Sequence, residues 1–150
     1  MLTIRKMKMS DSDALHEILS DPAVMEFLED PLTEERTQEF LETAGLNDPP
    51  LIYAVEDNEG FIGYVIYHDY DEESVEIGWV LKQSVWNRGY AKKLTKLLID
   101  RARSDNKNVI LECIPEQKVT RHIAQSYGFS HTGRRENCDV YRLDLRQKKG

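Results

Sequence analysis

The chain contains few residues of the kinds that build metal centres or disulfide frameworks. Its only two cysteines are Cys113 and Cys138, and its four histidines show no metal-ligand spacing. Two distant thiols form neither a local metal knuckle nor a disulfide framework. A Ser/His/Asp nucleophile elbow and a complete P-loop are also missing. We therefore expect no metal and a reducing, cytoplasmic location.

Long apolar runs and an excess of positive charge are absent as well. No stretch approaches the roughly 18 apolar residues that a membrane helix requires, and the N-terminal run MLTIRKMKMSDSD lacks the apolar core of a signal peptide. Acidic residues outnumber basic ones by 27 to 20. This balance disfavours nucleic acids and anionic membranes as partners, because both need a basic face. We expect one soluble domain, 1–150, that is a monomer or a homodimer.

Hydrophobic periodicity predicts a regular alternation of strands and helices. The expected strands cover 2–7, 51–55, 61–67, 75–81, 109–114, 131–135 and 140–145. The expected helices cover 10–28 with a break at Asp21-Pro22, then 33–45, 89–102 and 119–127. The order β-α-α-β-β-β-α-β-α-β-β is typical of an α/β (α+β) mixed sheet with helices on both faces. It includes an antiparallel meander over 51–81 and a parallel β-α-β crossover after it.

Residues 75–104, VEIGWVLKQSVWNRGYAKKLTKLLIDRARS, are the most informative part of the chain. They predict a buried strand, a polar turn and a helix whose first turn contains Asn87-Arg88-Gly89-Tyr90-Ala91. Backbone N–H groups at the positive end of a helix dipole suit a phosphate. Gly89 and Ala91 keep side chains away from an approaching ligand. The alternative is an ordinary strand-to-helix connection with one glycine.

This order and three local patterns resemble the GCN5-related N-acetyltransferase (GNAT) family, from Leu2 to about Leu145. The family's acetyl-CoA loop has Arg or Gln, two variable residues, Gly, one variable residue, and Gly or Ala. Here that run is Trp86-Asn87-Arg88-Gly89-Tyr90-Ala91, in which Trp86 departs from the pattern but is similar to the ribosomal-protein acetyltransferase branch. The other two patterns are Tyr127-Gly128-Phe129, similar to the end of the last family helix, and Ile77-Gly78-Trp79-Val80-Leu81, similar to the strand before the loop.

The resemblance implies acetyl-CoA as co-substrate, with the pantetheine arm on the backbone of the strand and the pyrophosphate on N–H groups of the loop. The positions concerned are Trp79, Val80, Leu81, Trp86, Asn87, Arg88, Gly89, Tyr90 and Ala91. Arg88 adds a cation there, whereas Trp86 could instead be a packing residue. At the family's Asn and Ser places stand Gln117 and Thr120, which either hydrogen-bond CoA or cap the helix after Pro115.

A carboxylate is the expected base, because an ammonium acceptor must lose a proton before its nitrogen attacks. Glu112 interrupts the apolar run 109–114, which is costly unless the position faces a wet cleft. Its spacing from Gln117 resembles that of the glutamate in the ribosomal N-terminal acetyltransferase branch. Glu76 is the second candidate. For both glutamates the alternative is a solvated position on an alternating strand.

The general acid is less well defined. Many relatives carry a tyrosine four residues before the closing glycine, where this chain has Ala124. Tyr127 lies nearby and is a third catalytic candidate, although its spacing of i, i+4 and i+8 with Val119 and Ile123 points it into the core. A water-assisted or purely positional mechanism is the alternative.

The function expected from these observations is acetyl transfer to a primary amine of a protein N-terminus, a lysine or a small molecule. Acidic residues between the first two helices either attract a cationic amine or complement a helix start; they are Glu29, Asp30, Glu34 and Glu35. The missing tyrosine keeps a second interpretation open, a non-catalytic GNAT-fold module that binds acyl-CoA. A more distant one is an unrelated phosphate-ligand protein that shares only the Gly89 loop.

Overall fold

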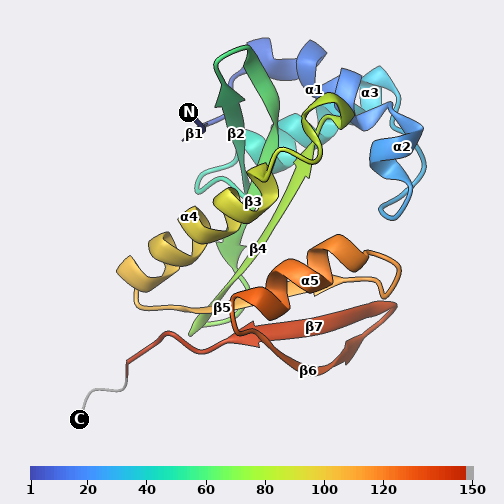
Figure 1. Ribbon diagram of the computed structural model, residues 1–150. Coiled ribbons are helices and arrows are strands. Elements are labelled where there is room, and N and C mark those ends of the chain that lie inside the picture. The colour runs from blue at the N-terminus through green and yellow to red at the C-terminus, as the bar shows by residue number, and fades with distance from the viewer. Residues whose placement is uncertain (148–150) are drawn as a thin grey trace. The chain divides into compact units, whose positions relative to one another are not determined.

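The computed structural model describes residues 1–147 of the protein, and this part of the chain has seven strands in one sheet (Figure 1). The strands are β1 Thr3–Arg5, β2 Ile52–Asp57, β3 Gly60–Asp69, β4 Ser74–Leu81, β5 Asn108–Cys113, β6 Ser130–Arg135 and β7 Cys138–Leu143. The α-helices are α1 Ser12–Leu19, α2 Pro22–Met25, α3 Glu34–Phe40, α4 Tyr90–Ser104 and α5 Lys118–Ser126. Three short helical turns complete the set: η1 Met9–Asp11 and η3 Gln83–Val85, both 3-10, and the π turn η2 Leu41–Gly45. The predicted mixed α/β fold is confirmed.

Two compact units make up the chain. The first contains Met1–Tyr67 and Trp79–Ala91, and the second contains His68–Gly78 and the chain from Lys92 onward. Strand β4 starts in the second unit and ends in the first. Hydrogen-bonded neighbours in the sheet follow the order β1-β2-β3-β4-β5-β7-β6.

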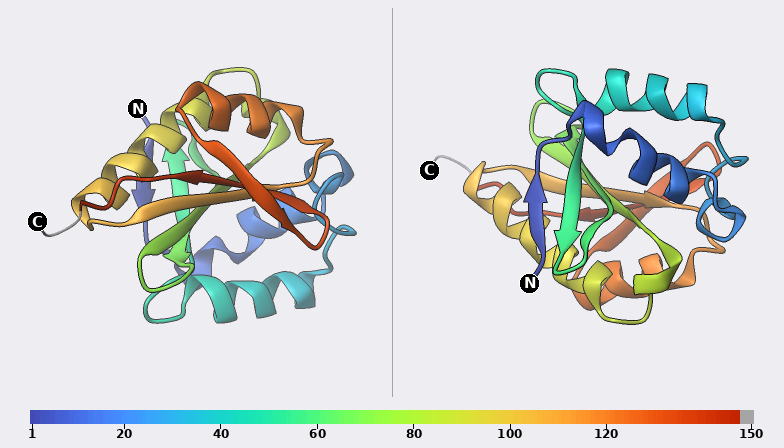
Figure 2. Two further views of the ribbon diagram at one scale, coloured as in Figure 1. Left: turned by 90° about the horizontal axis from the view of Figure 1, so that it is seen from below. Right: turned by 90° about the horizontal axis from the view of Figure 1, so that it is seen from above.

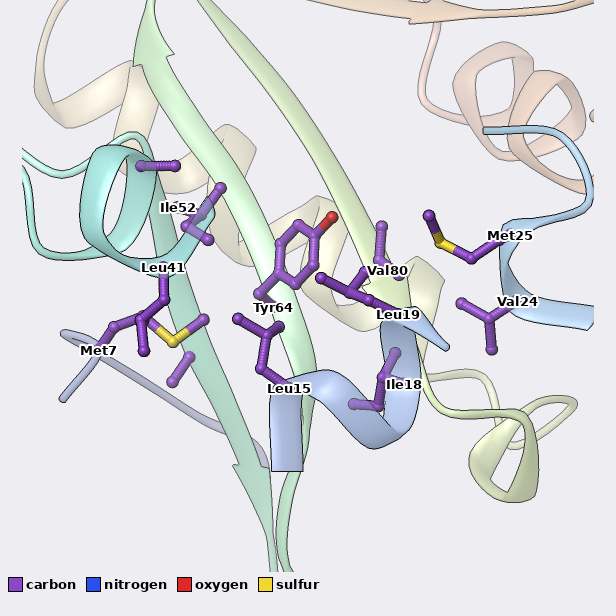
Figure 3. Packing of buried hydrophobic residues seen from close by; sticks show 12 residues of the cluster. Met7, Leu15, Ile18, Leu19, Val24, Met25, Leu41, Ile52, Tyr64 and Val80 are labelled. Carbon is purple, nitrogen blue, oxygen red and sulfur yellow. The ribbon is translucent and has the colours of Figure 1, made fainter. Parts of the chain in front are cut away.

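The core of the first unit consists of apolar side chains from the early helices and from the strands beside them (Figure 3). Leu15 and Leu19 of α1 and Leu41 of η2 are almost completely buried, and they cluster with Ile52 of β2 and Tyr64 of β3. Leu15 and Leu19 share one helix face because they are four residues apart. Burying a leucine stabilises a fold by about 1.5–3 kcal/mol, so this stripe is what holds α1 in place.

Strands β2 and β3 pair antiparallel, with a register shift between Val55 and Glu56. Gly63 lies beside this bulge, opposite Val55, and has a φ of +155°. A Cβ atom there would stand 2.1 Å from the carbonyl oxygen of Val80. Only glycine therefore allows β3 to lie this close to the end of β4.

A bidentate ion pair anchors the beginning of the first unit. The Arg5 guanidinium donates hydrogen bonds of 2.9 and 2.8 Å to the two carboxylate oxygens of Asp11, and it also pairs with Glu56. Asp11 further accepts the backbone N–H of Lys8 at 2.8 Å, which starts η1. The hydrogen bond from Arg5 lowers the pKa of Asp11 below its usual value, although burial acts in the opposite direction.

In the second unit β5 lies between β4 and β7 (Figure 2). The pair β4–β5 is parallel, from Ser74 opposite Asn108 to Glu76 opposite Ile110, so the predicted parallel crossover is confirmed. Both β5–β7 and β6–β7 are antiparallel. The last strand of the chain, rather than β6, is thus the neighbour of β5.

Helix α4 is the longest helix, and its buried stripe follows the predicted period, with Leu94, Leu98 and Ala102 inward. Among the described residues, no helix is both long and apolar enough to cross a membrane. The loop residues Asn87 to Gly89 precede α4, which begins only at Tyr90. The prediction that they form part of the first helical turn is therefore wrong, because Asn87 and Gly89 have φ angles of 66° and 79° that an α-helix cannot accommodate.

Candidate functional site

The site residues that the sequence predicts fall into two groups, one in each unit. The residues expected to contact CoA at the end of β4 and in the following loop belong to the first unit. The candidate base, the candidate acid and the start of α5 belong to the second.

The register between β3 and β4 fixes the direction of the backbone groups of β4. The Lys82 N–H donates to the Ile62 carbonyl at 2.9 Å, and the Tyr70 N–H donates to the Ser74 carbonyl at 2.9 Å. These bonds at the two ends of β4 establish an antiparallel pair, which confirms the predicted meander. Hydrogen-bonding direction alternates along a strand, so the even-numbered residues of β4 bond toward β3.

The odd-numbered residues Trp79 and Leu81 therefore turn their backbone N–H and C=O groups away from β3. The described ladder between β4 and β5 ends at Glu76, before either residue. An extended amide ligand binds along such a strand edge. The Leu81 carbonyl already accepts one hydrogen bond, from the Trp86 indole, and a carbonyl oxygen has a second lone pair for a ligand. Val80 differs from its neighbours, because its backbone turns toward β3 and its side chain is buried in the core of the first unit.

The loop before α4 is shaped for an anion. Left-handed residues stand on both sides of Arg88, namely Asn87 with a φ of 66° and Gly89 with a φ of 79°. Backbone turns that contain left-handed residues gather N–H groups into concave anion sites. An added Cβ at Gly89 would meet no atom within 4 Å, so the space above this glycine is open. Packing thus does not account for the glycine, whereas its positive φ does.

Two side chains of this segment are tied to the rest of the first unit. The Trp86 indole nitrogen donates to the carbonyl oxygen of Leu81 at 2.9 Å, although 41% of Trp86 is exposed. The Tyr90 hydroxyl donates to the Asp57 carboxylate at 3.3 Å. Trp86 therefore holds the loop to the end of β4 by a specific hydrogen bond, and it is not a plain packing residue.

Gln117 immediately precedes α5. Its side-chain oxygen accepts the Ile114 N–H at 3.1 Å, and its own backbone N–H donates to the Ile114 carbonyl at 3.0 Å. These bonds close the turn after β5. Gln117 is the N-cap residue of α5, but its side chain makes no capping hydrogen bond to that helix. The side-chain NH2 group of Gln117 is not part of either bond. Thr120 lies in the first turn of α5 and is partly exposed.

The candidate base Glu112 lies on a polar face of the second unit's sheet. Glu76 stands opposite Ile110 on the neighbouring strand, and Ile110 and Glu112 share one face because they are two residues apart. On the other side, Glu112 stands opposite Val140, and Cys138 is two residues from Val140 and opposite Arg135. Strand alternation therefore brings Glu76, Glu112 and Arg135 to the same face.

The contacts agree with this placement. The Arg135 guanidinium lies 3.7 Å from Glu112 Oε2 and within 3.5 Å of the Tyr70 hydroxyl. His68 Nε2 lies 3.8 Å from Glu76 Oε1. We call these five residues, His68, Tyr70, Glu76, Glu112 and Arg135, the Glu112 cluster.

The surroundings of Glu76 shift the pKa of its carboxyl group. Burial raises its pKa above the usual value, the charge of Glu112 acts in the same direction, and His68 and Arg135 oppose it. Perturbed carboxyl groups that share a face with a second carboxyl are typical of proton-transfer sites. Both predicted candidate bases thus lie in one cluster.

Tyr127, the third catalytic candidate, lies outside the Glu112 cluster. Its hydroxyl donates a 2.9 Å hydrogen bond to the Lys92 carbonyl near the start of α4, and the Lys92 ammonium lies 6.0 Å from the centre of its ring. These contacts favour a structural role. Ala124, at the family's tyrosine position, is completely buried.

Two of the four acidic residues between the first helices, Glu34 and Glu35, lie at a helix start, whereas Glu29 and Asp30 lie in the preceding loop. Thr33 is the N-cap of α3 and accepts the Arg36 N–H at 3.1 Å, and Glu34 and Glu35 lie in the first turn of that helix. Acidic side chains at this end complement the helix dipole.

The sequence prediction does not include Tyr70 or Arg135. Tyr70 lies in the turn after β3, and Arg135 is the last residue of β6, so neither belongs to a recognisable motif. Their proximity to Glu112 follows from the strand order β5-β7-β6, which no local pattern reveals.

Comparison with known proteins supports the resemblance. The model of the Acetyltransferase (GNAT) domain family matches residues 1–130. The chain is 27% identical over 142 residues to the uncharacterized N-acetyltransferase YnaD of Bacillus subtilis (strain 168), which covers 91% of this chain and 84% of that protein. A GNAT-family acetyltransferase from Bacillus anthracis superposes with a TM-score of 0.80 at 28% identity, covering 94% of this chain and 92% of that one.

Two further solved structures share the fold at lower identity. The putative acetyltransferase yncA from Salmonella typhimurium, with its cofactor acetyl-CoA, has a TM-score of 0.73 at 21% identity and covers 100% of this chain and 97% of that one. The spermidine N-acetyltransferase from Vibrio cholerae, in complex with CoA and spermine, has a TM-score of 0.77 at 21% identity. The match covers 94% of this chain and 92% of that one. With a family model that spans most of its length, the protein belongs to the GNAT acetyltransferases.

Proposed function

We propose that this acetyltransferase moves the acetyl group of acetyl-CoA to a primary amine and that the Glu112 cluster receives the amine's proton. The observation that carries this proposal is the position of Glu76 and Glu112 on one face of adjacent, paired strands. Burial and the neighbouring charge of Glu112 raise the pKa of Glu76, so this carboxyl binds a proton more strongly than usual.

The first unit supplies the groups for the co-substrate. The backbone of Trp79 and Leu81 pairs with the pantetheine amides, and the N–H groups around Asn87 and Gly89 hold the pyrophosphate. The open space above Gly89 fits this assignment, since a phosphate must approach the backbone there. Arg88, which is exposed, adds a positive charge to the same loop.

The second unit supplies the base. The acceptor arrives as an ammonium ion, and a carboxylate of the Glu112 cluster takes its proton directly or through water. The neutral nitrogen then attacks the thioester carbonyl; the C–N bond forms, the C–S bond breaks, and the electron pair leaves with the sulfur. The nitrogen gives up its second proton, which passes through water to the departing thiolate. Glu112 is the first choice for this base and Glu76 the second.

No tyrosine stands at the usual place of the acid, and the Tyr127 hydroxyl is engaged with Lys92. We propose that water protonates the departing thiolate and that positioning supplies much of the rate, since well-oriented reactants gain about 7–11 kcal/mol. Tyr127 is the alternative donor.

The acceptor is a primary amine on a protein N-terminus, a lysine or a small molecule. The Trp86 run makes a protein N-terminus, as in the ribosomal-protein branch, one class to test. Spermine in the Vibrio cholerae structure makes a polyamine another. Both cysteines are free thiols, in keeping with the cytoplasmic location that forms part of this proposal.

The test measures release of CoA thiol from acetyl-CoA with a panel of amines: spermine, a peptide with a free N-terminus, an N-blocked lysine peptide and a small alkylamine. We expect turnover with at least one of them. Glu112→Gln should reduce kcat by about 10²–10⁴, the usual range for a positioned base, while calorimetry shows unchanged acetyl-CoA binding.

The outcomes separate the alternatives. Acetyl-CoA binding without thiol release from any amine would support the non-catalytic acyl-CoA-binding module. Equal turnover of Glu112→Gln and the parent would reject Glu112, and Glu76→Gln then becomes the decisive variant. Absence of acetyl-CoA binding would reject the whole proposal.

A further inference from the structure

Arg135 holds an unusual place in the Glu112 cluster, because it is the one cation among acidic and aromatic groups there that carries charge at every physiological pH. Its guanidinium lies 3.7 Å from Glu112 Oε2 and 5.8 Å from the centre of the Tyr70 ring. The side chain of Arg135 is 64% exposed, whereas that of Glu112 is only 15% exposed. An exposed cation thus covers a largely buried anion.

The contacts of Arg135 are long. The closest are 3.5 Å to the Tyr70 hydroxyl and 3.7 Å to Glu112 Oε2. Because the Arg135 end of this ion pair is exposed and both of its contacts are long, solvent screens the guanidinium and it is held weakly. Within residues 1–147, Glu112 Oε2 is buried and has no hydrogen-bond partner. A buried carboxylate oxygen with an unmade hydrogen bond is costly, so a better donor gains by binding there.

Every element around the carboxylate pair contributes a charged or titratable group. These are His68 from β3, Tyr70 from the following turn, Glu76 from β4, Glu112 from β5, Arg135 from β6, Glu136 from the turn after it, and Cys138 and Arg142 from β7. Arg142 stands opposite Ile110 on the same face, but its guanidinium pairs with Asp144 at 2.6 Å. Arg135 is therefore the permanent cation that contacts Glu112, and His68 is positive only when protonated.

We propose that Arg135 is the counter-ion of the Glu76–Glu112 pair in the acceptor-free protein and that the cationic group of the acceptor takes its place on Glu112 and on the Tyr70 ring. This role rests on the proposed amine acetylation. It defines the acceptor as an amine that arrives protonated, because only a cation replaces a cation without leaving the buried carboxylate uncompensated. Arg135 is therefore a positioning residue that acts through the carboxylates.

Charge balance gives this role a kinetic signature. The pH profile of kcat/KM reports the free protein, in which Arg135 still faces the pair, and that of kcat reports the acceptor complex, from which it has moved away. Arg135 opposes the raised pKa of Glu76. Removing its charge should therefore move the acidic limb of kcat/KM to higher pH and leave the acidic limb of kcat unchanged.

The variants are Arg135→Gln, which removes the charge, and Arg135→Lys, which restores it. With the best amine of the panel, Arg135→Gln should lower kcat/KM on the acidic limb by about two- to fivefold and by less than about twofold on the plateau, the scale expected for an exposed pair. Arg135→Lys should return the limb toward the parent position.

Arg134→Gln is the matched control. Arg134 is the preceding residue and is 59% exposed, and it lies 3.8 Å from the carboxylate of Asp139, which is 18% exposed. Asp139 stands opposite Cys113 and so belongs to the other face of the sheet. The control therefore removes an equally long arginine–carboxylate contact away from Glu112, and it should leave both limbs in place.

A second measurement is independent of turnover. The side-chain carboxyl ¹³C signals of the glutamates are titrated by NMR in the protein without acetyl-CoA or amine, for the parent, Arg135→Gln and Arg134→Gln. Because Arg135 lowers the pKa of Glu76, titration of Glu76 should move to higher pH in Arg135→Gln alone.

An unchanged NMR titration would overturn the counter-ion role. A changed titration with both kinetic limbs moved equally would show that Arg135 stays beside Glu112 in the complex, which overturns the exchange with the acceptor. If no amine of the panel is acetylated, the proposed function fails, and the NMR titration still decides whether Arg135 governs the pair.

Discussion

The indole nitrogen of Trp86 donates a 2.9 Å hydrogen bond to the carbonyl oxygen of Leu81. This bond connects the last residue of β4 with the loop that precedes α4. The two segments are those to which the family resemblance assigns the pantetheine arm and the pyrophosphate. One side chain thus holds both parts of the expected co-substrate site in a fixed relation within the first unit.

Removing this bond should weaken co-substrate binding. Trp86→Phe keeps an aromatic ring but lacks the N–H donor, so the loop loses a hydrogen bond worth about 0.5–1.5 kcal/mol. We expect acetyl-CoA affinity, measured by calorimetry, to fall by about three- to tenfold through lost preorganisation. Trp86→Gln retains a donor and should lose less; equal affinities of the parent and Trp86→Phe would contradict this role.

Gly89 should tolerate neither bulk nor negative charge. Gly89→Glu should lower acetyl-CoA affinity by at least tenfold, about 1.4 kcal/mol, because the added side chain enters the open space above the loop and repels phosphate. Gly128→Ala is the control, since Gly128 has a similar φ of +85° and also no neighbour within 4 Å of an added Cβ. It should lower the melting temperature without a loss of affinity. Normal binding by folded Gly89→Glu would show that the phosphate lies elsewhere.

Tyr127→Phe should leave most of the activity intact. The variant keeps the ring beside Lys92 and removes the hydroxyl that donates to the Lys92 carbonyl. The expected effect is a loss of about 0.5–1.5 kcal/mol in unfolding free energy, measured with urea. A fall of about 100-fold or more in kcat at an unchanged melting temperature would instead identify Tyr127 as the proton donor to the thiolate.

The ion pair between Arg5 and Asp11 should make the free energy of unfolding depend on pH in the acidic range. The hydrogen bond with Arg5 lowers the pKa of Asp11 in the folded protein. The stabilisation by the ion pair is therefore complete above the ordinary pKa of 3.8, and it is lost as the pH falls through the lower pKa of the folded protein. Asp11→Asn should therefore cost about 1.5–3 kcal/mol at neutral pH. The difference from the parent should vanish in acid, as measured by urea unfolding across pH.

Glu17→Gln is a suitable comparison for that experiment. Glu17 lies on α1, close to Asp11 along the chain, but its side chain is exposed. Its variant should match the parent at each pH. If the unfolding free energy of Asp11→Asn stays below that of the parent by the same amount down to the lowest pH, the substitution has removed packing rather than the ion pair.

Local patterns in the sequence were sufficient for the order of elements. Apolar spacing on α4 and alternation on β3 to β5 are consequences of helix and strand geometry, which act over a few residues. The apolar run also marked Glu112 as a polar residue in an apolar strand, whereas the assignment of Trp79 and Leu81 to the co-substrate came from the family resemblance and stays a prediction. The start of α4 was misplaced, because the left-handed conformation of Asn87 has no unambiguous local signal.

Only the tertiary structure decided the surroundings of Glu112. Tyr70 and Arg135 are separated by 65 residues in the chain, yet a hydrogen bond joins them beside the candidate base. Their meeting requires β7 to pair with β5 and β6 to pair with β7, and such pairings depend on the burial of the whole sheet rather than on neighbouring residues. The sequence by itself therefore determined the order of elements and singled out Glu112 as a candidate, whereas long-range strand pairing determined which charge faces its carboxylate.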